Sequence, residues 1–211
     1  MTRIGILDLQ GGVVEHLAHL ERLGVPALRV KQAADMDGLA GLIIPGGESS
    51  CLGRLLCRYG LDRAIREGFA AGLKLWGTCA GAILVAKQVD DEPGLLGFMD
   101  IHIRRNAFGS QLDSFNDSAR IPQVADYPLP LTFIRAPKIT GLGAGVRALL
   151  TLKDYCAAAE DAQTLATVFH PELTADLSFH RYFCRKCGLE TRADPEPDWQ
   201  WDSWTRLTPI P

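Results

Sequence analysis

The pentapeptide at residues 77–81, Gly-Thr-Cys-Ala-Gly, constrains the fold more than any other feature of this sequence. It lies between a short apolar run, residues 73–76, and a helix-like run, and it has the form of a nucleophile elbow with cysteine in place of serine. In such an elbow a strand ends in a sharp turn, flanking glycines remove Cβ clashes, and a helix begins just behind the nucleophile. The pentapeptide therefore predicts a strand–turn–helix unit.

Cys79, at the centre of the pentapeptide, is a candidate nucleophile. The N–H groups and partial positive charge of a helix N-terminus favour a thiolate over a thiol, and a nearby histidine favours it further. The alternative is a buried cysteine that packs as a small apolar side chain, which is the usual environment of a free cysteine. The short pattern alone leaves both interpretations open.

Residues with matching chemistry lie downstream, at His170 and Glu172. His170 directly follows an apolar run, residues 164–169, and we expect it at a strand end with its ring free of the core. A histidine moves the proton of a nucleophilic thiol, and a carboxylate fixes the tautomer of that histidine. Taken separately, a structural histidine and a surface acid are the simpler interpretations. Together with Cys79 they form a complete catalytic set.

A Gly-Gly turn at Gly46 and Gly47 is a candidate site for negative charge. It follows a buried apolar run, residues 41–44, and precedes a predicted helix start at Ser49. Backbone N–H groups in such a turn can stabilise an oxyanion, and we expect the N–H of Gly47 to act with that of Ala80 behind the nucleophile. A turn without this function is the alternative.

Short apolar runs alternate with helix-like stretches through the first half of the chain. Four runs are typical of parallel strands joined by crossovers: residues 4–9, 27–30, 42–44 and 73–76. A helix is expected between residues 13 and 23, and the region 98–152 has the short runs and breaks of a β-rich segment. The pattern predicts a single-domain α/β fold with a layered, mostly parallel sheet, helices on both faces and sites at the carboxyl ends of the strands.

Charge and hydropathy exclude several classes of protein. The 211 residues carry a net charge of −3 without a basic cluster, so a nucleic-acid binder is not expected. No apolar run is long enough to span a bilayer, and the first residues enter a strand without the pattern of a signal peptide, so we expect a cytoplasmic protein. Residues 10–12, Gln-Gly-Gly, lack the spacing of a Rossmann or P-loop motif.

Cysteine spacing raises the question of a zinc site. Cys184 and Cys187 form a C-x-x-C pair, and His180 lies one helical turn earlier. Structural zinc requires four ligands, and Cys51, Cys57 and Cys156 provide no second pair, so we expect no metal. Inward packing of Cys184 and Cys187 on a terminal helix is the preferred interpretation.

These motifs, in this order, resemble the triad-type, class I glutamine amidotransferases. Within that family, the resemblance is to the glutaminase subunits of pyridoxal 5′-phosphate synthase, and it covers residues 4 to about 187. The additional motifs that carry it are residues 9–11, 105–106, 108–109, 111–115, 133–137 and 169–174.

The resemblance implies a function for each matched position. Cys79 is implied as the nucleophile that attacks the side-chain amide of L-glutamine, with His170 and Glu172 completing a triad. The residues implied to bind glutamine or its oxyanion are Gly47, Glu48, Ser49, Arg105, Ile134 and Arg135. Arginines, backbone carbonyls and Glu48 suit a zwitterionic amino acid, although solvated surface charge is the alternative for both arginines.

The resemblance also implies a flavodoxin-like fold and a partner. Ammonia would pass to a (β/α)₈ synthase subunit in a hetero-oligomeric complex, and the hydrolysis itself needs no cofactor. Gln10 is implied in a mobile region that responds to this partner, although it is also an ordinary strand-end residue. Two alternatives remain: a glutaminase subunit of another synthase, such as those of histidine, purine or anthranilate synthesis, and a non-catalytic interaction subunit.

Two features depart from the family pattern. Ala107 and Ser110 stand where the family usually has serine and arginine, so fewer polar contacts are expected in that loop and its docking on the synthase is affected. We expect a glutamine amidotransferase domain over residues 1–188 and an irregular, acidic tail rich in proline and tryptophan over residues 189–211.

Overall fold

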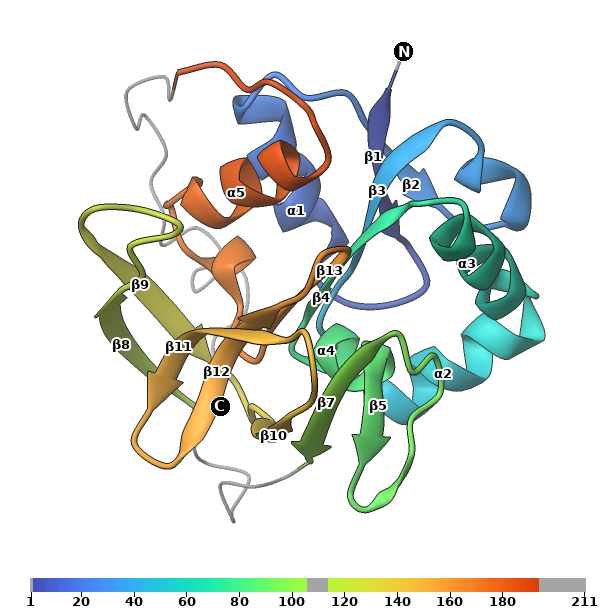
Figure 1. Cartoon of the computed structure of the whole chain (residues 1–211). Coiled ribbons are helices and arrows are strands. Elements are labelled where there is room, and N and C mark those ends of the chain that lie inside the picture. Colours follow the sequence, from blue (N-terminus) through green and yellow to red (C-terminus); the bar gives the residue numbers. More distant parts are fainter. Residues whose placement is uncertain (1, 106–113, 194–211) are drawn as a thin grey trace, which may run out of the picture.

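The computed structural model describes residues 2–105 and 114–193 (Figure 1). The loop positions Ala107 and Ser110, and the tail from residue 194 onward, lie outside the described residues. In chain order the helices are α1 (Val13–Arg22), α2 (Ser49–Arg58), α3 (Leu61–Ala70), α4 (Ala80–Val85) and α5 (Ser178–Lys186), with the short 3₁₀ helices η1 (Ala33–Met36) and η2 (Pro171–Leu173).

The strands form one large mixed sheet and a separate two-stranded ribbon. In chain order they are β1 (Arg3–Leu7), β2 (Ala27–Val30), β3 (Leu39–Ile44), β4 (Lys74–Thr78), β5 (Ala86–Val89), β6 (Glu92–Pro93), β7 (Met99–Arg104), β8 (Phe115–Arg120), β9 (Pro128–Phe133), β10 (Lys138–Leu142), β11 (Arg147–Leu152), β12 (Tyr155–Glu160) and β13 (Thr164–Thr167). The order across the large sheet is β2-β1-β3-β4-β13-β12-β10-β7-β5-β6, with β11 also paired to β12, while β8 and β9 form the ribbon.

The half of the sheet from β2 to β13 is parallel throughout. Each predicted apolar run of the first half of the chain lies in one of these strands or overlaps it. Their continuous apolar sequences follow from burial on both faces, since crossover helices cover a parallel sheet on each side. The predicted single-domain α/β fold is thereby confirmed.

Helices pack on both faces of the sheet (Figure 1). On one face, α1 and α5 bury residues such as Leu20 and Phe183 with Trp76 of β4. On the other, α2 and α3 bury residues such as Leu56 and Ile65 with Leu75. Neighbouring residues of β4 therefore enter different cores, as the alternation of side chains along a strand requires.

The first helix ends where the sequence predicts. Gly24 has a left-handed φ of 67°, and its N–H donates to the Glu21 carbonyl while the Val25 N–H donates to the Leu20 carbonyl. These two bonds make a Schellman cap, in which glycine is favoured because it lacks a Cβ. The chain is then directed back into β2.

The predicted β-rich character of residues 98–152 is also confirmed. This region contains β7, β8, β9, β10 and β11. β11 and β12 are antiparallel neighbours joined by a tight turn, whereas β10 pairs antiparallel with β7 and β12, which are more distant in the chain. The sheet is therefore parallel on one side and mixed on the other.

The first residues of the expected tail contact the body of the protein. The Arg192 N–H donates to the Leu23 carbonyl at 2.9 Å, and the Arg181 guanidinium donates to Thr191 Oγ1 at 2.8 Å. Described residues 189–193 thus lie against the C-terminal end of α1, and the domain boundary at residue 188 stays a prediction.

Candidate active site

Cys79 lies in a strained turn between β4 and α4. Its backbone φ of 48° and ψ of −104° are unusual for a residue other than glycine. A Cβ added at Gly81 would lie 1.9 Å from the Ile44 carbonyl oxygen, and one added at Gly77 would lie 2.4 Å from the carbonyl carbon of Gly81. The glycines therefore permit the close approach of α4 to β3 and β4, and the predicted elbow has the expected shape.

The strand order brings the candidate site together. β3, β4 and β13 are parallel neighbours, so the Gly46 turn, Cys79 and His170 all follow strand ends at the same edge of the sheet. The Cys79 N–H donates to the Thr167 carbonyl at 2.8 Å, which fixes the elbow to β13.

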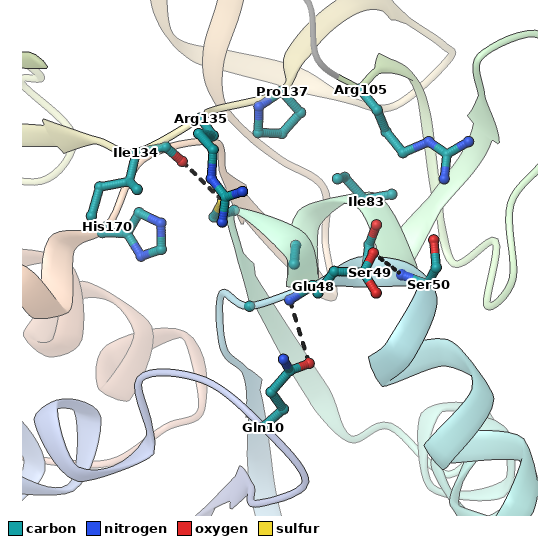
Figure 2. A pocket seen from close by; sticks show the side chains of 13 residues that line it. Gln10, Glu48, Ser49, Ser50, Ile83, Arg105, Ile134, Arg135, Pro137 and His170 are labelled. Carbon is teal, nitrogen blue, oxygen red and sulfur yellow. Dashed lines mark hydrogen bonds between the residues drawn. The ribbon is translucent and has the colours of Figure 1, made fainter. Parts of the chain in front are cut away.

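His170 and Glu172 form a close pair beside this elbow. His170 caps η2, and its Nδ1 lies 2.7 Å from Glu172 Oε1. Glu172 is completely buried. Gly46 lies next to both the imidazole and the nucleophile, because a Cβ added there would lie 2.3 Å from His170 Cε1 and 3.3 Å from Cys79 Cβ. Figure 2 shows the imidazole of His170 directed into the pocket.

The electrostatics of this pair favour a charged histidine and a charged acid. Burial alone would lower the pKa of His170, but the charge of Glu172 and interactions with Cys79 raise it well above its ordinary value. Burial alone would raise the pKa of Glu172, but His16, His170 and hydrogen bonding hold it below its ordinary value. The arrangement stabilises an imidazolium next to a carboxylate.

A pocket of about 420 Å³ opens in front of Cys79 (Figure 2). Glu172 lies behind His170, outside the lining. All other predicted site residues line the pocket: Gly47, Glu48, Ser49, Cys79, Ala80, Arg105, Ile134, Arg135 and His170. Gln10 lines it as well. The structure thus brings together residues from widely separated parts of the sequence.

Glu48 is held in place by backbone N–H groups. Its carboxylate accepts from the N–H of Ser50 at 2.9 Å and of Cys51 at 2.6 Å, and so caps the N-terminus of α2. These bonds lower the pKa of Glu48, which therefore stays charged. The Glu48 N–H donates to Gln10 Oε1 at 3.4 Å, a contact drawn in Figure 2. Sequence reasoning did not foresee the capping role.

Two arginines border the pocket, Arg135 beside Ile134 and Arg105 beyond Pro137 (Figure 2). Arg105 is oriented by Asp90, whose Oδ2 accepts from its Nε at 2.6 Å and whose Oδ1 accepts from its backbone N–H at 2.9 Å. Arg135 has a left-handed φ of 45°, directly after the Ile134 carbonyl that lies 3.9 Å from Cys79 Sγ. Asp90 was missed from the sequence because a surface acid in a turn carries no distinctive pattern.

The Gly46–Gly47 peptide has a defined orientation. A Cβ added at Gly11 would lie 1.6 Å from the Gly46 carbonyl oxygen, so this oxygen faces Gly11. Because the two polar groups of a trans peptide point in opposite directions, the Gly47 N–H points away from Gly11. Gly47 itself has a φ of 155°. A side chain at residue 11 would disturb this peptide.

A family model for the SNO glutamine amidotransferase family matches residues 6–189. The chain belongs to the SNO glutamine amidotransferase family.

Relatives support this membership over almost the whole chain. A protein of Syntrophus aciditrophicus named pyridoxal 5′-phosphate synthase subunit PdxT is 54% identical over 211 residues, which cover 98% of this chain and 94% of the relative. A PdxT protein of Clostridium kluyveri is 45% identical over 88% of this chain and 99% of its own length. A crystal structure of a glutamine amidotransferase matches with a TM-score of 0.82 and 40% identity, over 88% of this chain and 99% of that one.

Three buried histidines behind Glu172 were not all recognised from the sequence. His16 and His19 lie on the apolar face of α1, and His180 of α5 meets them across the core. The signal available was their spacing, since residues three apart share one face of a helix. Both ring nitrogens of His180 contact other histidines. Neither nitrogen is therefore directed toward Cys184 or Cys187, the cysteines considered with it as zinc ligands.

Cys184 of α5 lies in the core, and Cys187, which caps the helix, is partly buried against it. Burial raises the pKa of Cys184 and of Cys187 to about 12, which keeps both as thiols. Within residues 2–105 and 114–193, no group of three His, Cys, Asp or Glu side chains has a geometry suited to a metal ion. In the same ranges, no helix is long and apolar enough to cross a membrane.

The buried histidines predict acid sensitivity of the fold. Burial lowers the pKa of His16 to about 4 and that of His19 to about 3, and lowers that of His180 well below its ordinary value. Each takes up a proton on unfolding below about pH 6.5, so the free energy of unfolding should fall by up to about 1.4 kcal/mol per pH unit for each histidine. Below about pH 6.5, His170 does not contribute to the pH dependence of the free energy of unfolding, since its raised pKa leaves it protonated in the folded and the unfolded chain.

Urea unfolding between about pH 6.5 and pH 5 measures this slope, above the range in which unfolded carboxylates titrate. The exposed, uncharged Gln88 of β5 provides the control, because Gln88→Ala removes no titratable group and should leave the slope unchanged. A free energy of unfolding that stays constant below pH 6.5 would contradict neutral, buried imidazoles.

Proposed function

We propose that this chain is the glutaminase subunit of a pyridoxal 5′-phosphate synthase, which hydrolyses L-glutamine to L-glutamate and ammonia. The family and the relatives named PdxT support this assignment. The observation that carries the chemistry is the placement of His170, bonded to buried Glu172 and next to Cys79 at the edge of a pocket. A thiol, a base and an acid in this order provide the nucleophile and the proton transfers that amide hydrolysis needs.

The reaction follows from these positions. The Cys79 thiolate attacks the carbon of the glutamine carboxamide, and a C–S bond forms. His170 gives its proton to the nitrogen as the C–N bond breaks, which releases ammonia and leaves a γ-glutamyl thioester. His170 then takes a proton from water, whose oxygen attacks the thioester. The C–S bond breaks, glutamate leaves, and the Cys79 thiolate and the protonated His170 are restored. Glu172 holds the imidazole and stabilises its charged form.

Each tetrahedral intermediate carries an oxyanion. We assign its stabilisation to the N–H groups of Gly47 and Ala80, which flank Cys79 on the lining of the pocket. Glycine at position 47 allows this peptide to change orientation at little steric cost. The oxyanion hole is therefore the part of the site most easily switched between two states.

The remaining lining residues suit the ends of an amino acid. Arg105 and Arg135 provide donors for the α-carboxylate, while the Ile134 carbonyl and Glu48 provide acceptors for the ammonium group. Ser49 adds a hydroxyl at the start of α2. The reaction requires no cofactor in this scheme, because every proton transfer is assigned to His170.

Ammonia formed here is useful only when a recipient is present. We assign the recipient as a (β/α)₈ synthase subunit in a hetero-oligomeric complex, which uses the ammonia in the synthesis of pyridoxal 5′-phosphate. Gln10 contacts Glu48 next to the Gly46–Gly47 peptide, so a partner bound near Gln10 can change the oxyanion hole directly. Binding shifts such an equilibrium only through contacts that differ between the two states.

The isolated chain should therefore be a poor glutaminase that a synthase subunit activates. We expect Gln10→Ala to reduce this activation roughly tenfold while the KM for glutamine changes less than about threefold. Glutamate release is measured with and without the synthase subunit, and Gln88→Ala, on an exposed part of β5, is the matched control. Full activity of the isolated chain, with a response only to a synthase of histidine, purine or anthranilate synthesis, would reject the proposal.

A further inference from the structure

A chain of buried side chains extends from the back of the candidate triad into the core. His16 Nε2 lies 3.6 Å from Glu172 Oε2, and His16 Nδ1 lies 2.8 Å from His180 Nε2. His180 Nδ1 lies 3.0 Å from His19 Nδ1. All three histidines are completely buried. Side chains of α1 and α5 thus connect to the acid that orients His170.

The free oxygen of Glu172 makes this connection important. Oε1 accepts from His170, whereas Oε2 is buried and forms no hydrogen bond to any described residue. A buried carboxylate oxygen without a donor costs free energy. Glu172 Oε2 has a polar contact with His16 Nε2, at 3.6 Å. Catalytic hydrogen bonds are often long in a free enzyme and tighten in the complex with substrate.

The chain can supply a donor to this oxygen only in one arrangement of protons. Burial keeps the three imidazoles neutral, so together they carry three N–H groups. Two of these are used in the contacts between the rings. The third must lie at one end of the chain. It is either on His16 Nε2, which lies 3.5 Å from Thr78 Oγ1 and 3.6 Å from Glu172 Oε2, or on His19 facing the backbone of Thr174.

The acceptors at the two ends decide between these arrangements. A carboxylate accepts a stronger hydrogen bond than a peptide carbonyl does. With the proton on His16 Nε2, its Nδ1 accepts from His180 Nε2, and His180 Nδ1 accepts from His19 Nδ1. The opposite arrangement would leave a lone pair on His16 Nε2, with the Thr78 hydroxyl as its donor and the negative charge of Glu172 beside it.

We infer that His16 is a positioning residue for hydrolysis, which donates its Nε2–H to Glu172 Oε2 in a tautomer that His180 and His19 fix. His16 lies outside the pocket lining, so it acts through Glu172 and His170 and not on the substrate. The inference rests on the proposed function for its kinetic consequence, whereas the tautomer is a property of the free protein. Trp76 packs edge-on against His16 and His180, at centroid distances of 5.6 Å and 4.9 Å, and helps to keep the chain dry.

Nitrogen NMR on the full chain with ¹⁵N-labelled histidine tests the tautomer directly. The protein has five histidines, and two-bond couplings distinguish protonation at Nδ1 from protonation at Nε2. We expect a neutral His16 with its proton on Nε2, His180 with its proton on Nε2 and His19 with its proton on Nδ1. A neutral His16 protonated on Nδ1 would overturn the inference.

Two substitutions test the positioning role. The amide of His16→Gln can reach the position of Nε2, whereas His16→Asn reaches only the position of Nδ1 and keeps the contact to His180. In complex with the synthase subunit, His16→Asn should lower kcat roughly tenfold with KM nearly unchanged, and His16→Gln should stay within about threefold of the parent. His102→Asn is the control.

An equal fall in kcat in His16→Asn and His16→Gln, or a raised KM with normal kcat, would refute the positioning role of His16 through Glu172. If either variant fails to fold, the tautomer in the parent chain still decides. Because that measurement needs no turnover, an inactive parent chain would count against the proposed function alone.

Discussion

Replacing Cys79 with alanine should abolish glutamine hydrolysis, with a loss of about 10⁴-fold or more, because no other group can form the thioester. The fold should survive, since alanine keeps the Cβ and the backbone φ of 48° is already imposed by the glycines around the elbow. Glutamate release by the complex with the synthase subunit measures the loss, and thermal unfolding checks the fold.

The exposed Cys57 provides a matched control for this substitution. Cys57→Ala should retain the activity of the parent chain, because Cys57 lies on α2 and does not line the pocket in front of Cys79. The complex that contains Cys79→Ala should still make pyridoxal 5′-phosphate when ammonium salt replaces glutamine. Residual hydrolysis by Cys79→Ala comparable with the parent would remove Cys79 from the mechanism.

The second large effect is expected at the base and its acid. In His170→Asn, kcat for glutamine hydrolysis should fall by about 10³-fold or more, because the substitution removes both the proton acceptor and the proton donor of the reaction. The fall in kcat should be no larger in Glu172→Gln, since this substitution leaves the imidazole of His170 in place and only destabilises its charged form. The pKa of His170 should fall in Glu172→Gln, because the charge of Glu172 is what raises it.

Steady-state kinetics of the assembled complex, with circular dichroism as the folding check, compare the two variants. A turnover near that of the parent in His170→Asn would rule out the triad. A larger loss in Glu172→Gln than in His170→Asn, with both folded, would assign the proton transfer to another group.

The parallel half of the fold was predictable because its physical signals are local. Continuous apolar runs report burial on both faces, and the glycines at positions 77 and 81 are required wherever a helix approaches a strand this closely. Since neighbouring parallel strands end at one edge, the meeting of Cys79 and His170 also followed from the sequence order. Their roles in hydrolysis stay predictions.

The remaining features depend on contacts that no local pattern contains. Asp90 and Arg105 are 15 residues apart, and their pairing depends on how β5 and β7 align. His16 and His19 are buried on α1, and the reason for two histidines there becomes visible only through their contacts with His180, which lies far away in the sequence. Histidine is amphipathic, so hydropathy alone does not reveal such a buried polar chain.

The most direct test of the account is the order in which the cysteines react with a glutamine-analogue electrophile. The complex with the synthase subunit is treated with a limiting amount of this reagent, and mass spectrometry of the digested chain locates the label among the six cysteines. The account predicts that Cys79 is labelled first and that excess glutamine protects it. Label spread evenly over the six cysteines, or found first on another one, would contradict it.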